Sequence, residues 1–222
     1  MPLSNVLFDL DGTLTEPALG ITNCYRFALE SLGRPAPAQS DLLKLIGPPM
    51  RRGFAVILAT DDAELIERAI ALYRERFARV GLYENEVYAG VRGMLGELRA
   101  AGLRLFVATS KVTEYSVRVL EHFDLAEFFV SVHGATPDGS LDDKALLVAR
   151  LLREEGLDPA ASVMIGDREH DIIAARRNSL RAVGVAYGYG SRAELTAAGA
   201  DFICDSPAEV AALLLGQKTR EF

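Results

Sequence analysis

Two aspartates two positions apart follow a short apolar run near the start of the chain. Asp9 and Asp11 come directly after residues 6–8, which are predicted to form a buried strand that ends before Gly12. Residues i and i+2 of an extended chain point the same way, so both carboxylates would emerge together. Their repulsion calls for a cation, a shared proton or a network of hydrogen bonds. Taken alone, the pair could equally form a turn in which an aspartate caps a helix.

Two further polar motifs follow later in the chain. Thr109 and Ser110 come directly after a predicted strand at 103–108, where a hydroxyl could donate to a phosphoryl oxygen or could simply cap a helix. Lys144 is expected in the first turn of a helix, where the macrodipole disfavours a cation by under about 1 kcal/mol. An anionic partner would explain this lysine, and so would exposure to solvent.

A second pair of acids follows the predicted strand at 162–165. Asp167 ends that strand, and Asp171 lies four residues later on the same face of a starting helix. Each acid could serve only to complement the helix N-terminus. In a parallel sheet, however, the pair would converge with Asp9 and Asp11 at the carboxyl edge. Four carboxylates around one point favour a hard divalent cation such as Mg²⁺, and no His or Cys cluster has the spacing of a zinc site.

Composition narrows the class of protein. The chain has 222 residues, of which 50% are hydrophobic, and a net charge of -7, which argues against a nucleic-acid polymer as partner. Cys24 and Cys204 lie in apolar patterns and are expected to be buried thiols, not a disulfide. No apolar run approaches membrane-spanning length, so we expect no membrane association and a soluble, cytoplasmic protein.

Short strands and helices alternate from about residue 87 onward. Strands are predicted at 103–108, 128–132, 162–165, 182–186 and 201–204, and helices at 91–101, around 117–123, at 144–155, at 172–177 and after Ser191 and Ser206. This alternation predicts an α/β fold with a doubly wound, mostly parallel sheet.

Residues 16 to about 80 carry apolar residues at helical spacing without any strand signal. We therefore predict an all-helical cap inserted directly after the first strand. The predicted boundaries are 1–15 with 84–222 for a Rossmann-like core and 16–83 for the cap, with hinges at 14–18 and 81–86. Ligands of open α/β sheets bind outside the carboxyl ends of the strands, so an insert that leaves from there would act as a lid.

Together, the motifs resemble those of the haloacid dehalogenase superfamily of phosphohydrolases. They stand in the superfamily's order across the whole chain: Asp9-x-Asp11-Gly12-Thr13, Thr109, Lys144, and Gly166-Asp167 followed by Asp171. The resemblance implies a Rossmann-like core with a helical cap and an enzyme that hydrolyses a phosphate monoester with Mg²⁺. The second aspartate, Asp11, is present in the phosphatase and phosphomutase branches and absent from true dehalogenases.

The resemblance also implies a role for each matching residue. Asp9 would attack phosphorus and form an aspartyl-phosphate, and Asp11 would protonate the leaving oxygen and then activate water. Thr109 and Lys144 would bind the transferring phosphoryl group. The metal residues would be Asp9, Asp11 through its backbone carbonyl, Asp167 and, from outside the ligand set, Asp171. Substrate contacts would come from Gly12, Thr13, Ser110, Arg51 and Arg52.

Within the superfamily, the chain looks most like the phosphoglycolate phosphatase-like group. Segments 88–91, 107–111, 164–172 and 187–190 are closest to its 5′-nucleotidase-like members. In the cap, segment 46–52 resembles a substrate-specificity loop, so Lys44, Arg51 or Arg52 could contact an anionic leaving group or could form an exposed basic turn. We expect a small phosphate monoester of the phosphoglycolate type, with nucleoside monophosphates or a phosphomutase reaction as alternatives, and a monomer or homodimer.

A signalling receiver domain is the alternative from another class of protein. Receivers also gather acids, a hydroxyl and a lysine around Mg²⁺ at the end of a parallel sheet. The helical insert, the Asp-x-Asp-Gly-Thr order at residues 9–13 and the Gly-Asp-x-x-x-Asp run at 166–171 argue against a receiver. Because all motif residues are present, a catalytically silent binding module is also disfavoured.

Overall fold

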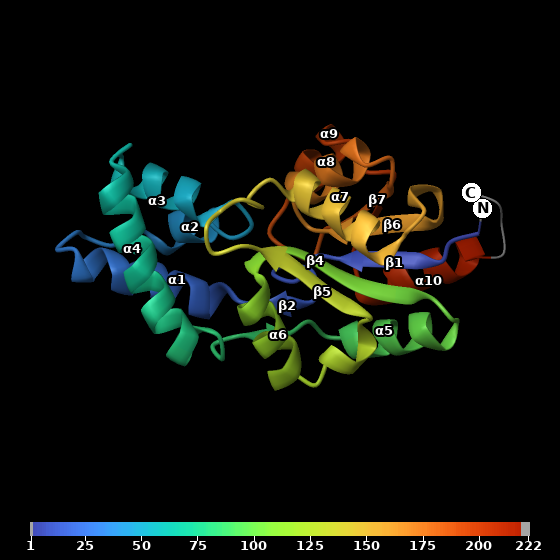
Figure 1. Cartoon of the computed structure of the whole chain (residues 1–222). Coiled ribbons are helices and arrows are strands. Elements are labelled where there is room, and N and C mark those ends of the chain that lie inside the picture. Colours follow the sequence, from blue (N-terminus) through green and yellow to red (C-terminus); the bar gives the residue numbers. More distant parts are fainter. Residues whose placement is uncertain (1, 219–222) are drawn as a thin grey trace. The chain divides into compact units, whose positions relative to one another are not determined.

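The computed structural model describes residues 2–218 and divides the chain into two compact units (Figure 1). The core unit comprises Met1–Glu16 and Val87–Phe222, and the helical unit comprises Pro17–Glu86. The chain leaves the core unit through β2 (Thr15–Glu16) and returns to it through β3 (Glu86–Val87), and these two short strands pair with each other.

The core unit contains a six-stranded sheet in the order β5-β4-β1-β6-β7-β8. Its strands are β1 (Asn5–Phe8), β4 (Arg104–Val112), β5 (Ser131–Ala135), β6 (Ser162–Gly166), β7 (Arg181–Val185) and β8 (Phe202–Cys204). All neighbouring strands run parallel. The strand β1 lies in the middle, between β4 and β6, so its carboxyl end is central to the edge at which parallel strands finish. The predicted α/β fold with a doubly wound parallel sheet is confirmed.

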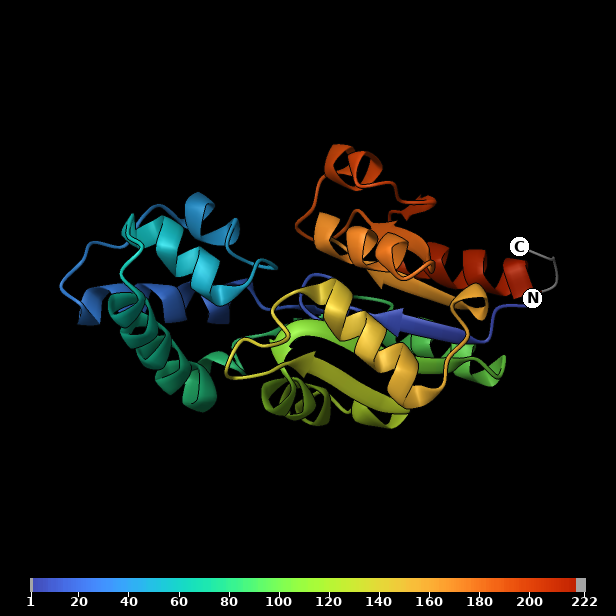
Figure 2. The same cartoon turned by 45° about the horizontal axis from the view of Figure 1, so that its top comes forward.

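Helices cover both faces of this sheet (Figures 1 and 2). They are α5 (Val91–Ala100), α6 (Thr113–His122), α7 (Lys144–Glu155), α8 (Glu169–Arg177), α9 (Arg192–Ala197) and α10 (Pro207–Lys218), with short 3-10 turns η2 (Ala126–Phe128) and η3 (Pro159–Ala161). The helices α7 and α8 pack together on one face of the sheet, and α5 and α10 pack together on the opposite face. Among the described residues, no helix combines the length and the apolar character needed to cross a membrane.

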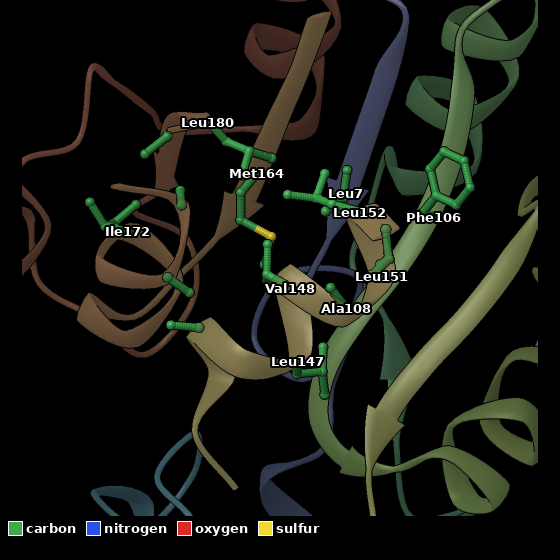
Figure 3. Packing of buried hydrophobic residues seen from close by; sticks show 14 of the residues in the cluster. Leu7, Phe106, Ala108, Leu147, Val148, Leu151, Leu152, Met164, Ile172 and Leu180 are labelled. Atoms are coloured by element: carbon green, nitrogen blue, oxygen red, sulfur yellow. The ribbon is translucent and has the colours of Figure 1, made fainter. Parts of the chain in front are cut away.

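A continuous apolar core joins the sheet to α7 and α8 (Figure 3). Leu7 pairs in register with Phe106 on β4 and with Met164 on β6, so these three side chains share one face of the sheet. Val148 and Leu151 of α7 pack against them, and all five side chains are fully buried. Burial of each such side chain contributes about 1.5–3 kcal/mol. This packing fixes the carboxyl ends of β1, β4 and β6 relative to one another.

The predicted limits of two strands, β4 and β5, are wrong. The strand β4 continues to Val112, beyond the predicted end at 108, because it stays paired with β5 across a register shift between Thr109 and Val112. The strand β5 begins at Ser131, three residues later than predicted, because residues 126–128 form the 3-10 turn η2.

The helical unit consists of α1 (Ala18–Ser31), α2 (Gln39–Leu43), α3 (Met50–Leu58), α4 (Ala63–Arg76) and the π-helix η1 (Phe77–Gly81). No strand lies within residues 17–85, so the strand-free segment predicted from 16 to about 80 is correct except at Glu16, which belongs to β2. Aromatic rings of Tyr25, Phe54 and Tyr73 contact one another with centroids 4.8–6.2 Å apart and join α1, α3 and α4.

A partly buried ion pair lies at the end of the helical unit. Arg76 donates two hydrogen bonds to Glu84, at 2.7 and 2.9 Å, and Asn23 donates a third at 3.3 Å. The guanidinium of Arg76 lowers the pKa of Glu84, although partial burial acts in the opposite direction. The pair therefore holds the last segment of the unit, just before β3, against α4 and α1.

Candidate active site

The first aspartate follows β1 without a break in the strand pairing. The amide of Asp9 donates to the carbonyl of Ile165 at 2.9 Å, and Asp9 is only 5% exposed. The chain then turns tightly, with the amides of Leu14 and Thr15 both donating to the carbonyl of Leu10. Gly12 has a φ of +87°, and a Cβ at this position would collide with the carboxylate of Asp167. Gly12 therefore allows the turn to lie directly against the acid that follows β6.

Lys144 bridges two of the predicted carboxylates. Its ammonium nitrogen lies 2.8 Å from Oδ1 of Asp9 and also pairs with Asp171, and the residue is 6% exposed. Burial lowers the pKa of Lys144, but the charges of Asp171 and Asp9 outweigh it and raise this pKa above its ordinary value. The interpretation of Lys144 as a solvent-exposed lysine is thus wrong, and the anionic partners that explain its place in the first helical turn are these two acids.

Asp171 and Asp167 are both fully buried at the start of α8. Oδ2 of Asp171 accepts from the amide of Arg168 at 3.0 Å, and Asp167 accepts from the amide of Tyr189 at 2.8 Å. Burial raises the pKa of Asp171 to about 6, although Lys144 lowers it, and raises the pKa of Asp167 well above its ordinary value. The helix start is therefore acidic, as predicted, and both aspartates are buried in the core unit.

Three of the predicted acids are placed where they could share a cation. Carboxylate oxygens of Asp9, Asp167 and Asp171 lie within 4.8 Å of one another. With Asp11 included, four acids face two lysines, Lys144 and Lys111, so the largely buried cluster has an excess of two negative charges when all four acids are ionised. A divalent cation with a preference for oxygen ligands balances this excess, so the residues present fit Mg²⁺.

Asp11 faces a different lysine. Its Oδ2 lies 2.8 Å from the ammonium nitrogen of Lys111, and the two side chains are 13% and 8% exposed. Its other oxygen is buried with no hydrogen-bond partner among the described residues. Burial raises the pKa of Asp11, and the nearby Lys111 acts against that rise. The two neighbouring carboxylates thus occupy distinct environments.

Lys111 has no role in the sequence interpretation, although it stands beside Thr109 and Ser110. The signal that would find it is the alternation of an extended chain, because positions 109 and 111 point to the same side of a continuing strand. Thr109 is 2% exposed, and its hydroxyl accepts from the amide of Lys111 at 3.2 Å. The helix-cap interpretation of Thr109 is wrong, since α6 begins only at Thr113. Ser110, its neighbour, is half-buried.

The segment 187–190 supports the acids from the end of β7. Tyr187 donates from its hydroxyl to the carbonyl of Thr13 at 2.9 Å, while the amide of Tyr189 binds Asp167. A Cβ at Gly188 would collide with the carbonyl of Gly12 and with Asp167. This glycine therefore lets the loop approach the turn and the acid closely.

Two of the three basic residues predicted to contact the leaving group make ion pairs within the helical unit. Arg51 lies 2.6 Å from Glu67 and Lys44 lies 2.8 Å from Asp41, whereas Arg52 is exposed. These pairs are at the surface and are worth little in stability. Substrate contact by these three residues stays a prediction.

Most of the chain matches a single protein-family model. The model described as haloacid dehalogenase-like hydrolase matches residues 6–185, a span that includes every acid and lysine of the site. The chain belongs to the haloacid dehalogenase-like hydrolases. The resemblance inferred from the motifs is therefore confirmed.

Relatives of this hydrolase carry several names. A 5′-nucleotidase of Pseudomonas aeruginosa is 43% identical over 87% of each chain, and a phosphoglycolate phosphatase of Caulobacter vibrioides is 32% identical over 91% of this chain and 87% of its own. The tyrosine-protein kinase PtkA of Mycobacterium tuberculosis is 38% identical over 83% of this chain and 62% of its own.

A solved structure supports the same fold and class. The crystal structure of a predicted phosphatase from Clostridium acetobutylicum superposes with a TM-score of 0.93 at 39% identity and covers 97% of this chain and 100% of its own. With the phosphatase-named relatives, this likeness confirms the prediction that the hydrolase is a phosphatase.

Proposed function

We propose that this phosphatase hydrolyses small phosphate monoesters with Mg²⁺ and that Asp9 is its nucleophile. The observation that carries the proposal is the buried arrangement of Asp9 beside Lys144, Asp167 and Asp171. A carboxylate next to a buried cation and a potential metal site can attack a phosphorus whose oxygens those positive charges neutralise.

The reaction then has two displacements. The carboxylate of Asp9 attacks phosphorus, an aspartyl-phosphate forms and the bond to the leaving oxygen breaks, while Asp11 gives that oxygen a proton. Asp11 next takes a proton from water, which attacks the same phosphorus and releases inorganic phosphate and free Asp9. The ammonium of Lys144 and the hydroxyl of Thr109 stabilise the charge on the phosphoryl oxygens.

The cation would be held by Asp9 and Asp167 with the backbone carbonyl of Asp11, and it would neutralise charge on the phosphoryl group. Asp171 supports this arrangement from behind. It pairs with Lys144 through one oxygen and accepts from the amide of Arg168 through the other. In this role Asp171 orients Lys144 and does not itself bind the cation.

Among leaving groups, we place nucleosides first and glycolate second. The relative named 5′-nucleotidase is 43% identical to this chain, against 32% for the one named phosphoglycolate phosphatase. Lys44, Arg51 and Arg52 of the helical unit are the residues proposed to contact the leaving group.

A panel of monoesters tests the proposal. With Mg²⁺ present, we expect phosphate release from nucleoside 5′-monophosphates or from phosphoglycolate, and its loss when Mg²⁺ is chelated. Free phosphate formed without any added sugar bisphosphate counts against the phosphomutase alternative. Absence of phosphate release across the whole panel contradicts the proposed function.

Phosphoryl transfer to a tyrosine is a second candidate, favoured by the 38% identity to a protein named tyrosine-protein kinase. An acyl phosphate on Asp9 could pass to a hydroxyl in place of water. Incubation with ATP and a tyrosine-containing acceptor distinguishes the two, because a kinase labels the acceptor whereas a phosphatase releases inorganic phosphate.

A further inference from the structure

Lys111 is the second buried lysine of the candidate active site. Its ammonium nitrogen lies 2.8 Å from Oδ2 of Asp11, and both side chains are largely shielded from solvent. We propose that Lys111 is a positioning residue that holds the Asp11 carboxylate in the orientation needed to protonate the leaving oxygen. The inference rests on the proposed function and deepens it, since it concerns the proton transfer at the same site.

The backbone of Lys111 is fixed on both sides. Its amide donates to the hydroxyl of Thr109 at 3.2 Å. Its carbonyl lies so close to Gly134 of β5 that a Cβ on that glycine would collide with it. Because β4 keeps its pairing with β5 across the register shift, Lys111 projects from a strand and not from a free loop. A side chain placed in this way can fix its partner's orientation.

The two lysines contact different members of the Asp9 and Asp11 pair. Lys144 contacts Asp9 and Asp171, whereas Lys111 contacts Asp11. The contact engages only Oδ2 of Asp11. Its Oδ1 is buried without a hydrogen-bond partner among the described residues, so this oxygen is left to exchange the proton. Orientation matters here, because misplacement of a catalytic group by about 1 Å costs about 10²-fold in rate.

The competing role for Lys111 is direct binding of the phosphoryl group, as proposed for Lys144. Leaving-group chemistry separates the two roles. An alkoxide leaving group needs the proton of Asp11, whereas p-nitrophenolate leaves without one. The value of kcat/KM reports the steps up to formation of the aspartyl-phosphate, so the ratio of kcat/KM for an alkyl phosphate to that for p-nitrophenyl phosphate measures the use of the proton.

The experiment compares wild-type protein with Lys111→Met and Lys144→Met on a nucleoside 5′-monophosphate, or phosphoglycolate, and on p-nitrophenyl phosphate. We expect Lys111→Met to lower the alkyl-to-aryl ratio by about tenfold or more. Lys144→Met, the matched control, should lower kcat/KM for both substrates together and change the ratio by less than about twofold. An equal fall for both substrates in Lys111→Met overturns the positioning role.

A double-mutant cycle completes the test. If Lys111 acts through Asp11, adding Lys111→Met to Asp11→Asn changes the ratio by less than about twofold. The proposal is overturned if Lys111→Met lowers the alkyl-to-aryl ratio in the Asp11→Asn background as much as it does in wild-type protein. Should Lys111→Met not fold, as judged by its melting temperature, Lys111→Arg keeps the charge, displaces the donor and should also lower the ratio, and an unchanged ratio in that variant overturns the proposal. Failure of wild-type protein to hydrolyse either substrate contradicts the proposed function itself.

Discussion

The candidate active site is organised by oppositely charged side chains that are mostly withdrawn from water. Asp9, Asp167 and Asp171 are each at most 5% exposed, and Lys144 is the cation placed among them. Removal of one partner from such a cluster leaves an uncompensated buried charge, which typically costs about 3–5 kcal/mol. The charged residues of the site therefore depend on one another for the stability of the fold.

Removal of Lys144 should affect both folding and activity. We expect Lys144→Met to lower the free energy of unfolding by about 3–5 kcal/mol at neutral pH, because Asp9 and Asp171 lose their shared cation. Denaturant unfolding measures the change. Matching stability of variant and wild type would show that the two acids do not depend on this lysine.

The close approach at Gly188 gives a prediction for metal binding. We expect Gly188→Ala to weaken Mg²⁺ binding by about tenfold, because its Cβ would displace Asp167. Gly93→Ala on α5 is the matched control. No heavy atom would lie within 4 Å of the added Cβ there, so stability should rise by about 0.5–1 kcal/mol with metal affinity unaltered. Equal Mg²⁺ affinity of Gly188→Ala and wild type, measured by calorimetry, would show that the close approach at Gly188 does not position Asp167 for metal binding.

The helices and strands differ in how far the sequence determines them. The limits of α7 match the predicted 144–155, because apolar periodicity and the left-handed Gly156 define that helix locally. The end of β4 could not be predicted in this way, since residues 109–112 stay extended only through pairing with β5. Lys111 escaped the sequence interpretation for the same reason. Alternation along the strand places Lys111 beside Thr109 only once β4 is known to continue past residue 108, and that continuation depends on the pairing with β5.

The helical unit offers a pH-dependent test of its ion pair between Arg76 and Glu84. The pKa of Glu84 is lowered in the folded protein, so the pair stabilises the fold above the ordinary glutamate value of 4.5 and this contribution is lost as pH falls through the lowered value. We expect Glu84→Gln to cost about 1 kcal/mol at neutral pH and less below that range. Thermal unfolding at several pH values measures the difference.

Glu75→Gln is the control for that variant. Glu75 pairs with Arg79 on the exposed surface of α4 and η1, where such pairs contribute under about 0.5 kcal/mol. Two results would show that the Arg76–Glu84 pair does not stabilise the helical unit. One is a loss of stability in Glu84→Gln no larger than that in Glu75→Gln. The other is a loss of stability in Glu84→Gln that does not become smaller at acidic pH.

At the scale of the whole molecule, the residues proposed for catalysis and those proposed to contact the leaving group belong to different units. All acids and lysines of the site belong to the core unit, whereas Lys44, Arg51 and Arg52 belong to the helical unit. The family, fold and acid cluster follow from motifs at strand ends. The leaving group does not, because the residues proposed to contact it lie on short surface helices and turns whose ion pairs are local.

We expect the helical unit to close over bound substrate by rotation at residues 14–18 and 81–86. Such closure would exclude water before the aspartyl-phosphate forms. Crystal structures of free protein and of protein with a phosphate analogue measure the rotation. The same position of the helical unit in both would contradict a lid.

Trapping the aspartyl-phosphate shows whether Asp9 is the nucleophile. Protein incubated with a labelled monoester and Mg²⁺ is quenched in acid within a single turnover, and its peptides are mapped. We predict Mg²⁺-dependent label on Asp9 and, in Asp9→Asn, loss of both the label and phosphate release. Phosphate release with no label on Asp9, or full activity in Asp9→Asn, would show that Asp9 is not the nucleophile.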